Sequence, residues 1–182
     1  MNRMWNPDLY MNAWNFASRA HIGQHVPGTD VSYLNHIGNV AMEAMTAVAQ
    51  GDGVDDPDLL VQCAVLHDVI EDTEYSYDDI KNEFGATVAD GVLALTKNSD
   101  LPAKQDRMKD SLARIKEQPH EVWMVKLCDR ITNLQPPPNH WDKAKIGNYL
   151  DEAKSIHNEL GPASANLADR LQTKIDEYAR HT

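Results

Sequence analysis

Hydrophobic residues recur with the spacing of an α-helix along most of the chain, and the strict alternation typical of β-strands is almost absent. The most apolar stretch, residues 59–66, follows Pro57, which suits the first turn of a helix. It predicts a buried central helix that reaches about Asp72. A second apolar stretch, residues 122–131, predicts another buried helix. This pattern favours an all-α fold with two buried helices at its centre.

Loop-forming and capping residues mark the ends of the other helices. Gly, Pro and Asp are frequent in residues 23–32 and predict an irregular loop, and Ser76-x-x-Asp79 has the form of a helix N-cap. The prolines at 136–138 end the second buried helix. Helices are therefore predicted over residues 8–21, 35–50, 57–72, 76–85, 87–95, 103–118, 119–135, 141–160 and 164–180. We expect one domain over residues 1–182, a bundle of about eight to ten helices.

The charge balance restricts the class of partner. With 17 Lys and Arg against 28 Asp and Glu, the formal net charge is −11, which argues against binding nucleic acid. No apolar run approaches the roughly 20 residues that span a membrane, and residues 1–7 do not resemble a signal peptide. Cys63 and Cys128 lie in apolar stretches, so we expect buried free thiols in a reducing cytoplasm. An anionic small molecule would need local positive charge, from a bound cation and a few Lys or Arg side chains.

Residues 66–73 contain the strongest candidate chemistry. Four ionisable side chains follow the apolar stretch directly: His67, Asp68, Glu71 and Asp72. On a helix, His67 and Glu71 lie one turn apart, and so do Asp68 and Asp72, so the four share one sector. Burying such groups unpaired would cost on the order of several kcal/mol each. The alternative is a solvated helix end whose charges face water.

A carboxylate recurs in the second apolar stretch, which is too hydrophobic to be a surface strip. Lys126, Asp129 and Asn133 fall at positions i, i+3 and i+7, so their side chains face the same way on a helix. A purely structural alternative is that Lys126 or Arg130 neutralises Asp129. The recurrence of an acid near the end of a second buried helix favours a functional role.

His36 follows the Gly-rich loop at the start of a predicted helix and adds a second imidazole; a histidine found alone at such a position is more often a capping or packed residue than a ligand. The candidate ligands are then two imidazoles and two carboxylates: His36, His67, Asp68 and Asp129. This set suits Mn²⁺, Fe²⁺ or Zn²⁺, and the two carboxylates favour Mn²⁺. Such an ion would polarise a phosphoryl oxygen. Glu71 and Asp72, one turn further on, are placed to orient or deprotonate an attacking water.

Several motifs resemble, in order and spacing, the hydrolase domain of RelA/SpoT proteins, which belongs to the HD superfamily of metal phosphohydrolases. The generic HD pattern is His36, then His67-Asp68, then Asp129. The more specific segments are Ser18-Arg19-Ala20-His21, Tyr33-Leu34-Asn35-His36, His67-Asp68-Val69-Ile70-Glu71-Asp72-Thr73, Phe84-Gly85-Ala86, Leu95-Thr96-Lys97 and Lys126-Leu127-Cys128-Asp129-Arg130-Ile131-Thr132-Asn133-Leu134. The match covers about residues 8–160. Stand-alone small alarmone hydrolases, which include the animal SpoT homologue, are the most similar in length.

The resemblance implies a helical HD fold and Mn²⁺-dependent removal of the 3′-pyrophosphate from ppGpp-type nucleotides, the alarmones of the stringent response. It implies that the candidate ligands above bind the metal and that Glu71 and Asp72 serve water activation and leaving-group chemistry. It also implies substrate contacts, to phosphates by the lysines and near the nucleotide by the others: Arg19, Tyr33, Lys126, Asn133, Lys145 and Tyr149. The expected partner is a nucleotide, hydrolysed and not synthesised.

Four positions depart from the family's common pattern: Ala20 and Ala103 stand where Lys is frequent, and Ser32 and Ile37 stand where Pro is frequent. They concern nucleotide recognition and not the metal, so adenine alarmones stand beside guanine alarmones as candidate substrates. Two other interpretations stay open. One is an HD-type nucleotidase or NADPH 2′-phosphatase that releases orthophosphate, and the other is an inactive nucleotide-binding module. The oligomeric state also stays open, with a homodimer among the alternatives.

Overall fold

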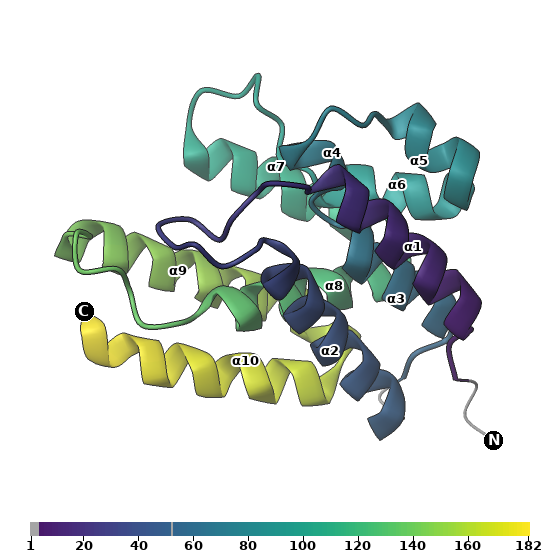
Figure 1. Cartoon of the computed structure of the whole chain (residues 1–182). Coiled ribbons are helices and arrows are strands. Elements are labelled where there is room, and N and C mark those ends of the chain that lie inside the picture. The colour runs from purple at the N-terminus through teal and green to yellow at the C-terminus, as the bar shows by residue number, and fades with distance from the viewer. Residues whose placement is uncertain (1–3, 52) are drawn as a thin grey trace.

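The computed structural model describes residues 4–51 and 53–182, and Figure 1 shows them as a bundle of helices. The described residues contain no strand; an isolated antiparallel bridge joins His25 and Ser32 in the loop between the first two helices. The α-helices are α1 (Pro7–Ala20), α2 (Leu34–Gln50), α3 (Pro57–Leu66), α4 (Val69–Asp72), α5 (Tyr77–Phe84), α6 (Ala86–Leu95), α7 (Lys104–Lys116), α8 (His120–Asn133), α9 (Lys143–Leu160) and α10 (Ala165–Tyr178). Short 3-10 helices follow α9 (Gly161–Ala163) and α10 (Ala179–His181). The predicted all-α class is confirmed.

The helix ends follow the capping residues in the sequence. At the start of α5, the Ser76 hydroxyl oxygen accepts from the Asp79 backbone N–H (3.3 Å), and the Asp79 carboxylate accepts from the Ser76 backbone N–H (2.7 Å). The Asp56 carboxylate caps α3. Gly51 ends α2 with a φ of 70°, in the left-handed region that favours glycine. These helix ends were predictable because each depends on residues close in sequence.

The helices α3 and α8 form the centre of the bundle. Helix α3 packs against α1, α2, α6 and α8, and α8 also packs against α9 and α10. Gly91 allows α6 to approach both central helices, because a Cβ at this position would lie 2.9 Å from Cys63 Sγ in α3 and 2.9 Å from Val122 Cγ2 in α8. Cys63 and Cys128 are buried and free, as predicted. The two buried helices expected from the apolar stretches are confirmed.

The central helix is shorter than its hydrophobic pattern predicts. A continuous helix over residues 57–72 is wrong, because α3 ends at Leu66 and α4 begins at Val69. His67 Nδ1 bonds to the Ala64 carbonyl oxygen (2.9 Å), and the Asp68 carboxylate accepts a hydrogen bond from the Tyr33 hydroxyl (2.5 Å). Adjacent side chains on an unbroken helix project about 100° apart. The break therefore lets His67 and Asp68 turn towards the same point.

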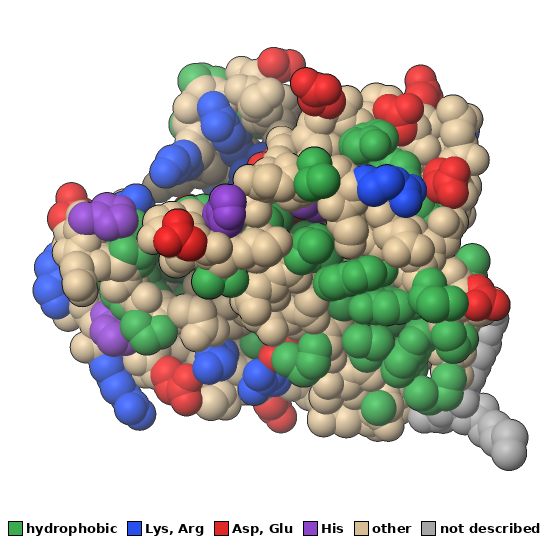
Figure 2. All heavy atoms as spheres, viewed as in Figure 1, with side chains coloured by type: hydrophobic (Ala, Val, Ile, Leu, Met, Phe, Trp, Pro, Cys, Tyr) green, Lys and Arg blue, Asp and Glu red, His purple; other side chains and the backbone are tan. Residues whose placement is uncertain are grey.

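In one view of the surface, cationic and hydrophobic side chains are concentrated over different helices. Figure 2 shows Lys and Arg side chains gathered on the lobe over α7, beside the hollow that separates this lobe from α9. Hydrophobic side chains gather instead over α1 and α2 in the same view. Within residues 4–51 and 53–182, no helix combines the length and the hydropathy that crossing a membrane requires. Despite the net charge of −11, one region of the surface is therefore rich in cations.

Candidate metal centre and active site

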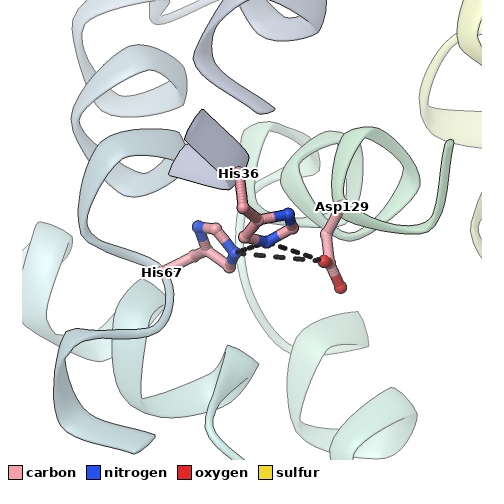
Figure 3. Close-up of side chains that lie close together, drawn as sticks. All are labelled: His36, His67 and Asp129. Carbon is pink, nitrogen blue, oxygen red and sulfur yellow. Dashed lines mark hydrogen bonds and ion pairs between the residues drawn. The ribbon is translucent and has the colours of Figure 1, made fainter. Parts of the chain in front are cut away.

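Three side chains from separate elements converge on a common point (Figure 3). His36 lies in the first turn of α2, His67 directly follows α3, and Asp129 lies near the end of α8. His36 Nε2 is 3.2 Å from His67 Nε2 and 3.5 Å from Asp129 Oδ1. The donor atoms of all three lie within 4.8 Å of one another, and all three residues are buried. The fold thus gathers two imidazoles and a carboxylate that the sequence separates widely.

The chemistry of this donor set fits a divalent cation. A carbonyl oxygen can only accept, so the bond to the Ala64 carbonyl oxygen shows that His67 Nδ1 carries a hydrogen. In the neutral ring, Nε2 then presents its lone pair to the cluster, as in metal-binding histidines whose other nitrogen is hydrogen-bonded. Burial would lower the pKa of His67, but the carboxylates of Asp68 and Asp129 raise it to about 9. The carboxylates of Asp68 and Asp129 thus make the potential at the cluster negative, and a negative potential favours a cation there.

Asp68 lies beside the three converging side chains. Its Oδ2 atom is 2.9 Å from His67 Nε2 and 3.5 Å from His36 Nε2, and it accepts the hydrogen bond from Tyr33. Burial would raise the pKa of Asp68, but His67 outweighs it and holds the pKa well below the usual range. Burial and the neighbouring Asp68 raise the pKa of the Tyr33 hydroxyl, so that this group stays a donor. Asp68 is therefore ionised and adjacent to both imidazoles.

Residues of its own helix hold the Asp129 carboxylate in place. Lys126 Nζ lies 3.0 Å from Oδ2, and Asn133 Nδ2 donates to Oδ1 at 2.5 Å. Burial would raise the pKa of Asp129, but Lys126 and then His67 lower it well below its usual range. The ion pair that the structural alternative required is therefore present. Lys126 bonds to Oδ2, whereas Oδ1 faces His36. Asp129 can therefore be neutralised by Lys126 and still take part in the donor cluster.

Glu71 and Asp72 lie in the short helix α4, next to the cluster, and differ in their surroundings. The Glu71 carboxylate accepts hydrogen bonds from the Lys97 ammonium (2.6 Å) and from the Lys97 backbone N–H (3.0 Å). The Asp72 side chain is exposed. Desolvation raises the pKa of Asp72, and the nearby Asp68 and Glu71 add to this effect. Glu71 is thus a fixed carboxylate and Asp72 an acid with a raised proton affinity.

Two clefts adjoin the cluster. The first, of about 610 Å³, is cationic because its lining holds five cations from four segments against two acids: Lys97, Lys104, Arg107, Lys126 and Lys145 against Asp142 and Glu152. The second, of about 540 Å³, is lined by neutral polar and aromatic side chains around His36, which include Asn133, Trp141 and Tyr149. Trp141 and Tyr149 line both clefts, so the two are neighbours. The donor cluster therefore contributes His36 to the neutral cleft and is linked to the cationic one through Lys126, which bonds to Asp129.

Most residues assigned to the substrate by resemblance lie around these clefts. Asn133 and Tyr149 line the neutral cleft, and Lys126, Lys145 and again Tyr149 line the cationic one. Tyr33 is bonded to Asp68 instead. Arg19 is exposed at the end of α1 and, among the described residues, does not belong to the lining of either cleft.

The sequence interpretation assigned no role to three cations of the first cleft. Lys97 ends the motif Leu95-Thr96-Lys97, which signalled its position but not its bond to Glu71. Lys104 and Arg107 lie in α7, for which the sequence predicts a helix over residues 103–118 and no further role. Their spacing of three residues places them on one helix face, and this spacing was the signal available.

Comparisons with known proteins agree with the resemblance seen in the sequence. A family model described as HD domain matches residues 13–173. The chain is 29% identical over 163 residues to guanosine-3′,5′-bis(diphosphate) 3′-pyrophosphohydrolase MESH1 of Danio rerio, covering 87% of each chain, and 28% identical over 170 residues to the Homo sapiens protein of the same name, covering 89% and 90%. A solved structure described as a metazoan orthologue of SpoT that hydrolyses ppGpp has the same fold, with a TM-score of 0.81, 24% identity and coverage of 96% and 98%. The chain belongs to the HD domain family.

Proposed function

We propose that this protein is a metal-dependent pyrophosphohydrolase that removes the 3′-pyrophosphate from guanosine 3′,5′-bis(diphosphate). The observation that carries the proposal is the donor cluster of His36, His67 and Asp129, which meets a neutral cleft at His36 and a cationic cleft at Lys126. The names of the Danio rerio and Homo sapiens relatives, which align over most of the chain, support the same reaction. The products are pyrophosphate and GDP.

The ligands in this proposal are His36, His67, Asp68 and Asp129, with Mn²⁺ as the preferred ion. Two imidazole nitrogens and two carboxylates suit Mn²⁺, with Fe²⁺ and Zn²⁺ as alternatives. When bound, the ion supplies Lewis-acid polarisation of a phosphoryl oxygen. The protein contributes the geometry: Ala64 fixes the ring of His67, and Lys126 and Asn133 fix the Asp129 carboxylate.

Glu71 and Asp72 divide the proton chemistry in this proposal. Water attacks the α-phosphorus of the 3′-diphosphate, the bond between this phosphorus and O3′ breaks, and O3′ leaves with a proton. The raised pKa of Asp72 suits its carboxylate to accept the proton that the water loses. Glu71, held by Lys97, orients the water. A base with a pKa nearer the working pH transfers protons more effectively.

The two clefts suit the two parts of such a substrate. A nucleotide with two diphosphate groups carries several negative charges, which the cationic cleft would neutralise in an otherwise acidic protein. The neutral cleft offers Trp141 and Tyr149 as flat apolar surfaces for a nucleoside, and the Asn133 amide as a hydrogen-bonding group. An amide and aromatic rings suit either purine, so the proposal includes adenine alarmones as substrates.

We also infer a single domain. One cluster of buried side chains includes residues of α1 near one end of the chain and of α10 near the other, and the helices between them contribute to the same cluster. The donors of the proposed metal centre come from α2, the end of α3 and α8. Because these elements share one core, the site depends on the folding of the whole bundle.

Product analysis tests the proposed reaction. The purified protein is incubated with guanosine 3′,5′-bis(diphosphate) and Mn²⁺, quenched with a chelator and resolved by anion-exchange chromatography. We expect GDP and pyrophosphate in equal amounts. Release of orthophosphate, from this substrate or from NADPH, would identify a nucleotidase or phosphatase instead. Nucleotide binding without turnover in the Mn²⁺-loaded protein would identify an inactive binding module.

A further inference from the structure

Gln24 connects the loop between α1 and α2 to the proposed catalytic helix α4. Its side-chain Nε2 donates to the backbone carbonyl oxygen of Asp72 at 2.7 Å, across 48 positions in the sequence. Its Oε1 lies 2.7 Å from Nδ1 of His21, at the end of α1. The backbone carbonyl of Gln24 accepts from the N–H of Tyr33 (3.0 Å), the residue whose hydroxyl bonds to Asp68. One residue thus joins three segments around the site.

The partners of Gln24 fix the direction of each hydrogen bond. A backbone carbonyl can only accept, so the amide nitrogen of Gln24 must face Asp72 and the amide oxygen must face His21. An amide oxygen also only accepts, so His21 Nδ1 must carry a hydrogen. His21 is 1% exposed, and within the described part of the chain its buried Nε2 has no hydrogen-bond partner. With the hydrogen on Nδ1, the unpaired Nε2 is an acceptor, so the buried ring has no donor without a partner.

The Asp72 carbonyl needs this donor because of its place in the fold. Helix α4 has four residues and ends at Asp72, and the last carbonyls of a helix lack partners within the helix. The following residue, Thr73, has extended backbone angles. Gln24 therefore holds the carbonyl side of Asp72, while the Asp72 backbone N–H donates to the Asp68 carbonyl oxygen (2.9 Å). Asp72 itself is exposed, so its neighbours restrain its carboxylate little.

We propose that Gln24 is a positioning residue for Asp72, and that the buried His21 sets the orientation of its amide. The inference rests on the proposed function, in which Asp72 accepts a proton from water. Without the donor at Nε2, the Asp72 carbonyl loses its partner at the end of α4, and the carboxylate shifts from its productive position. Such displacement slows the chemical step. It leaves nucleotide binding intact because neither Gln24 nor His21 lines the two clefts, as judged from the described residues.

Two pairs of matched variants test the proposal. Gln24→Met keeps the length of the side chain but removes its donor and its acceptor, and Gln172→Met makes the same change on the exposed face of α10. His21→Leu removes the Nδ1 donor, whereas His21→Asn is similar in size and keeps a donor near the same place. For each variant, kcat and KM are measured with guanosine 3′,5′-bis(diphosphate), together with Mn²⁺ affinity and Tm.

We expect Gln24→Met and His21→Leu each to lower kcat about tenfold, with KM and Mn²⁺ affinity close to the wild-type values. His21→Asn should recover most of the loss, and the double variant Gln24→Met/His21→Leu should be no slower than the slower single variant, because both act through one bond. Gln172→Met should leave kcat unchanged. If a methionine at position 24 prevents folding, Gln24→Asn, which is too short to reach both partners, replaces it.

Other results would overturn the inference. A Gln24→Met protein with wild-type kcat would show that Asp72 needs no support from this residue. Losses in Tm and Mn²⁺ affinity that parallel the loss in kcat, without recovery in His21→Asn, would show a purely structural brace. A wild-type protein without turnover would instead refute the proposed function, and the positioning role with it. Failure of the two proposals is therefore distinguishable.

Discussion

The two sides of the donor cluster are built in different ways. On the α8 side, Asp129 lies within one unbroken buried helix and is held by Lys126 and Asn133, three positions before it and four after it. Helical spacing alone brings these groups together. On this side the site is therefore local: a short stretch of sequence contains both the proposed ligand and the residues that orient it.

On the α3–α4 side, the helix breaks and distant residues supply the support. Tyr33 bonds to Asp68, Gln24 to the Asp72 carbonyl, and Lys97 to Glu71. Each partner comes from a loop or a helix end outside α3 and α4. We infer that the α8 side provides a rigid ligand. The α3–α4 side positions the reactive groups through separate tertiary contacts, each of which can be changed without the others.

The largest expected effect comes from the rigid side. Asp129→Ala should lower turnover about 100-fold or more, because it removes a proposed ligand. It also leaves the Lys126 ammonium buried without its carboxylate, which should destabilise the fold by about 3 kcal/mol. Turnover and urea unfolding measure the two effects. Asp151→Ala, an exposed acid on α9, is the control and should change neither. Wild-type turnover in Asp129→Ala would show that α8 contributes no metal ligand to the site.

A large effect on turnover alone is expected from the adjustable side. Glu71→Gln should lower kcat about 100-fold, since an amide cannot orient water as a carboxylate does. Mn²⁺ binding, measured by calorimetry, should stay unchanged because Glu71 bonds to Lys97 and not to the donor cluster. Glu74→Gln, an exposed neighbour, is the matched control. If Glu71→Gln bound the metal more weakly and turned over normally once loaded, Glu71 would belong with the ligands.

A smaller effect is expected from the support of Asp68. Tyr33→Phe removes the hydroxyl that donates to Asp68 Oδ2 and should weaken Mn²⁺ binding about tenfold. The ring remains, so Tm should change little. The matched control is Tyr77→Phe, which removes an exposed hydroxyl bonded to Asp90. Equal Mn²⁺ affinities in the two variants would show that Asp68 needs no partner from the distant loop.

The smallest effect on activity is expected at Gly91, where α6 packs against both α3 and α8. Gly91→Ala places a Cβ 2.9 Å from atoms of α3 and α8, and should lower the free energy of unfolding by about 2 kcal/mol through overpacking. At low temperature, where the variant is folded, turnover should change less than about twofold because the site itself is intact. Gly147→Ala, in α9 with open space at its Cβ, should instead stabilise slightly. Loss of turnover in folded Gly91→Ala would mean that the central packing tunes the site.

The same comparison explains what the sequence predicts well. The helices and their ends follow local signals, such as the Ser76 cap and the Gly51 stop, and the α8 side of the site follows from the spacing of Lys126, Asp129 and Asn133. Such features depend on residues within one or two turns. Periodicity and capping are enough to predict them.

The features that the sequence predicts poorly depend on tertiary contacts. The apolar run continues to Ile70, so periodicity predicts an unbroken helix, and the break at His67 and Asp68 follows from side-chain bonds, one of them to the distant Tyr33. The cationic cleft likewise needs Lys97, Arg107 and residues of α9 to meet in space. Nothing in the spacing of one segment predicts these meetings.

Pulsed electron paramagnetic resonance of the Mn²⁺-loaded protein tests the central claim most directly. If imidazoles from α2 and from the end of α3 bind one ion, the spectrum should show one Mn²⁺ per chain with nitrogen hyperfine couplings. These couplings should change to the ¹⁵N pattern in protein labelled with ¹⁵N-histidine, and the contribution of one ring should disappear in His36→Ala. A bound Mn²⁺ without histidine coupling would contradict the proposed metal centre.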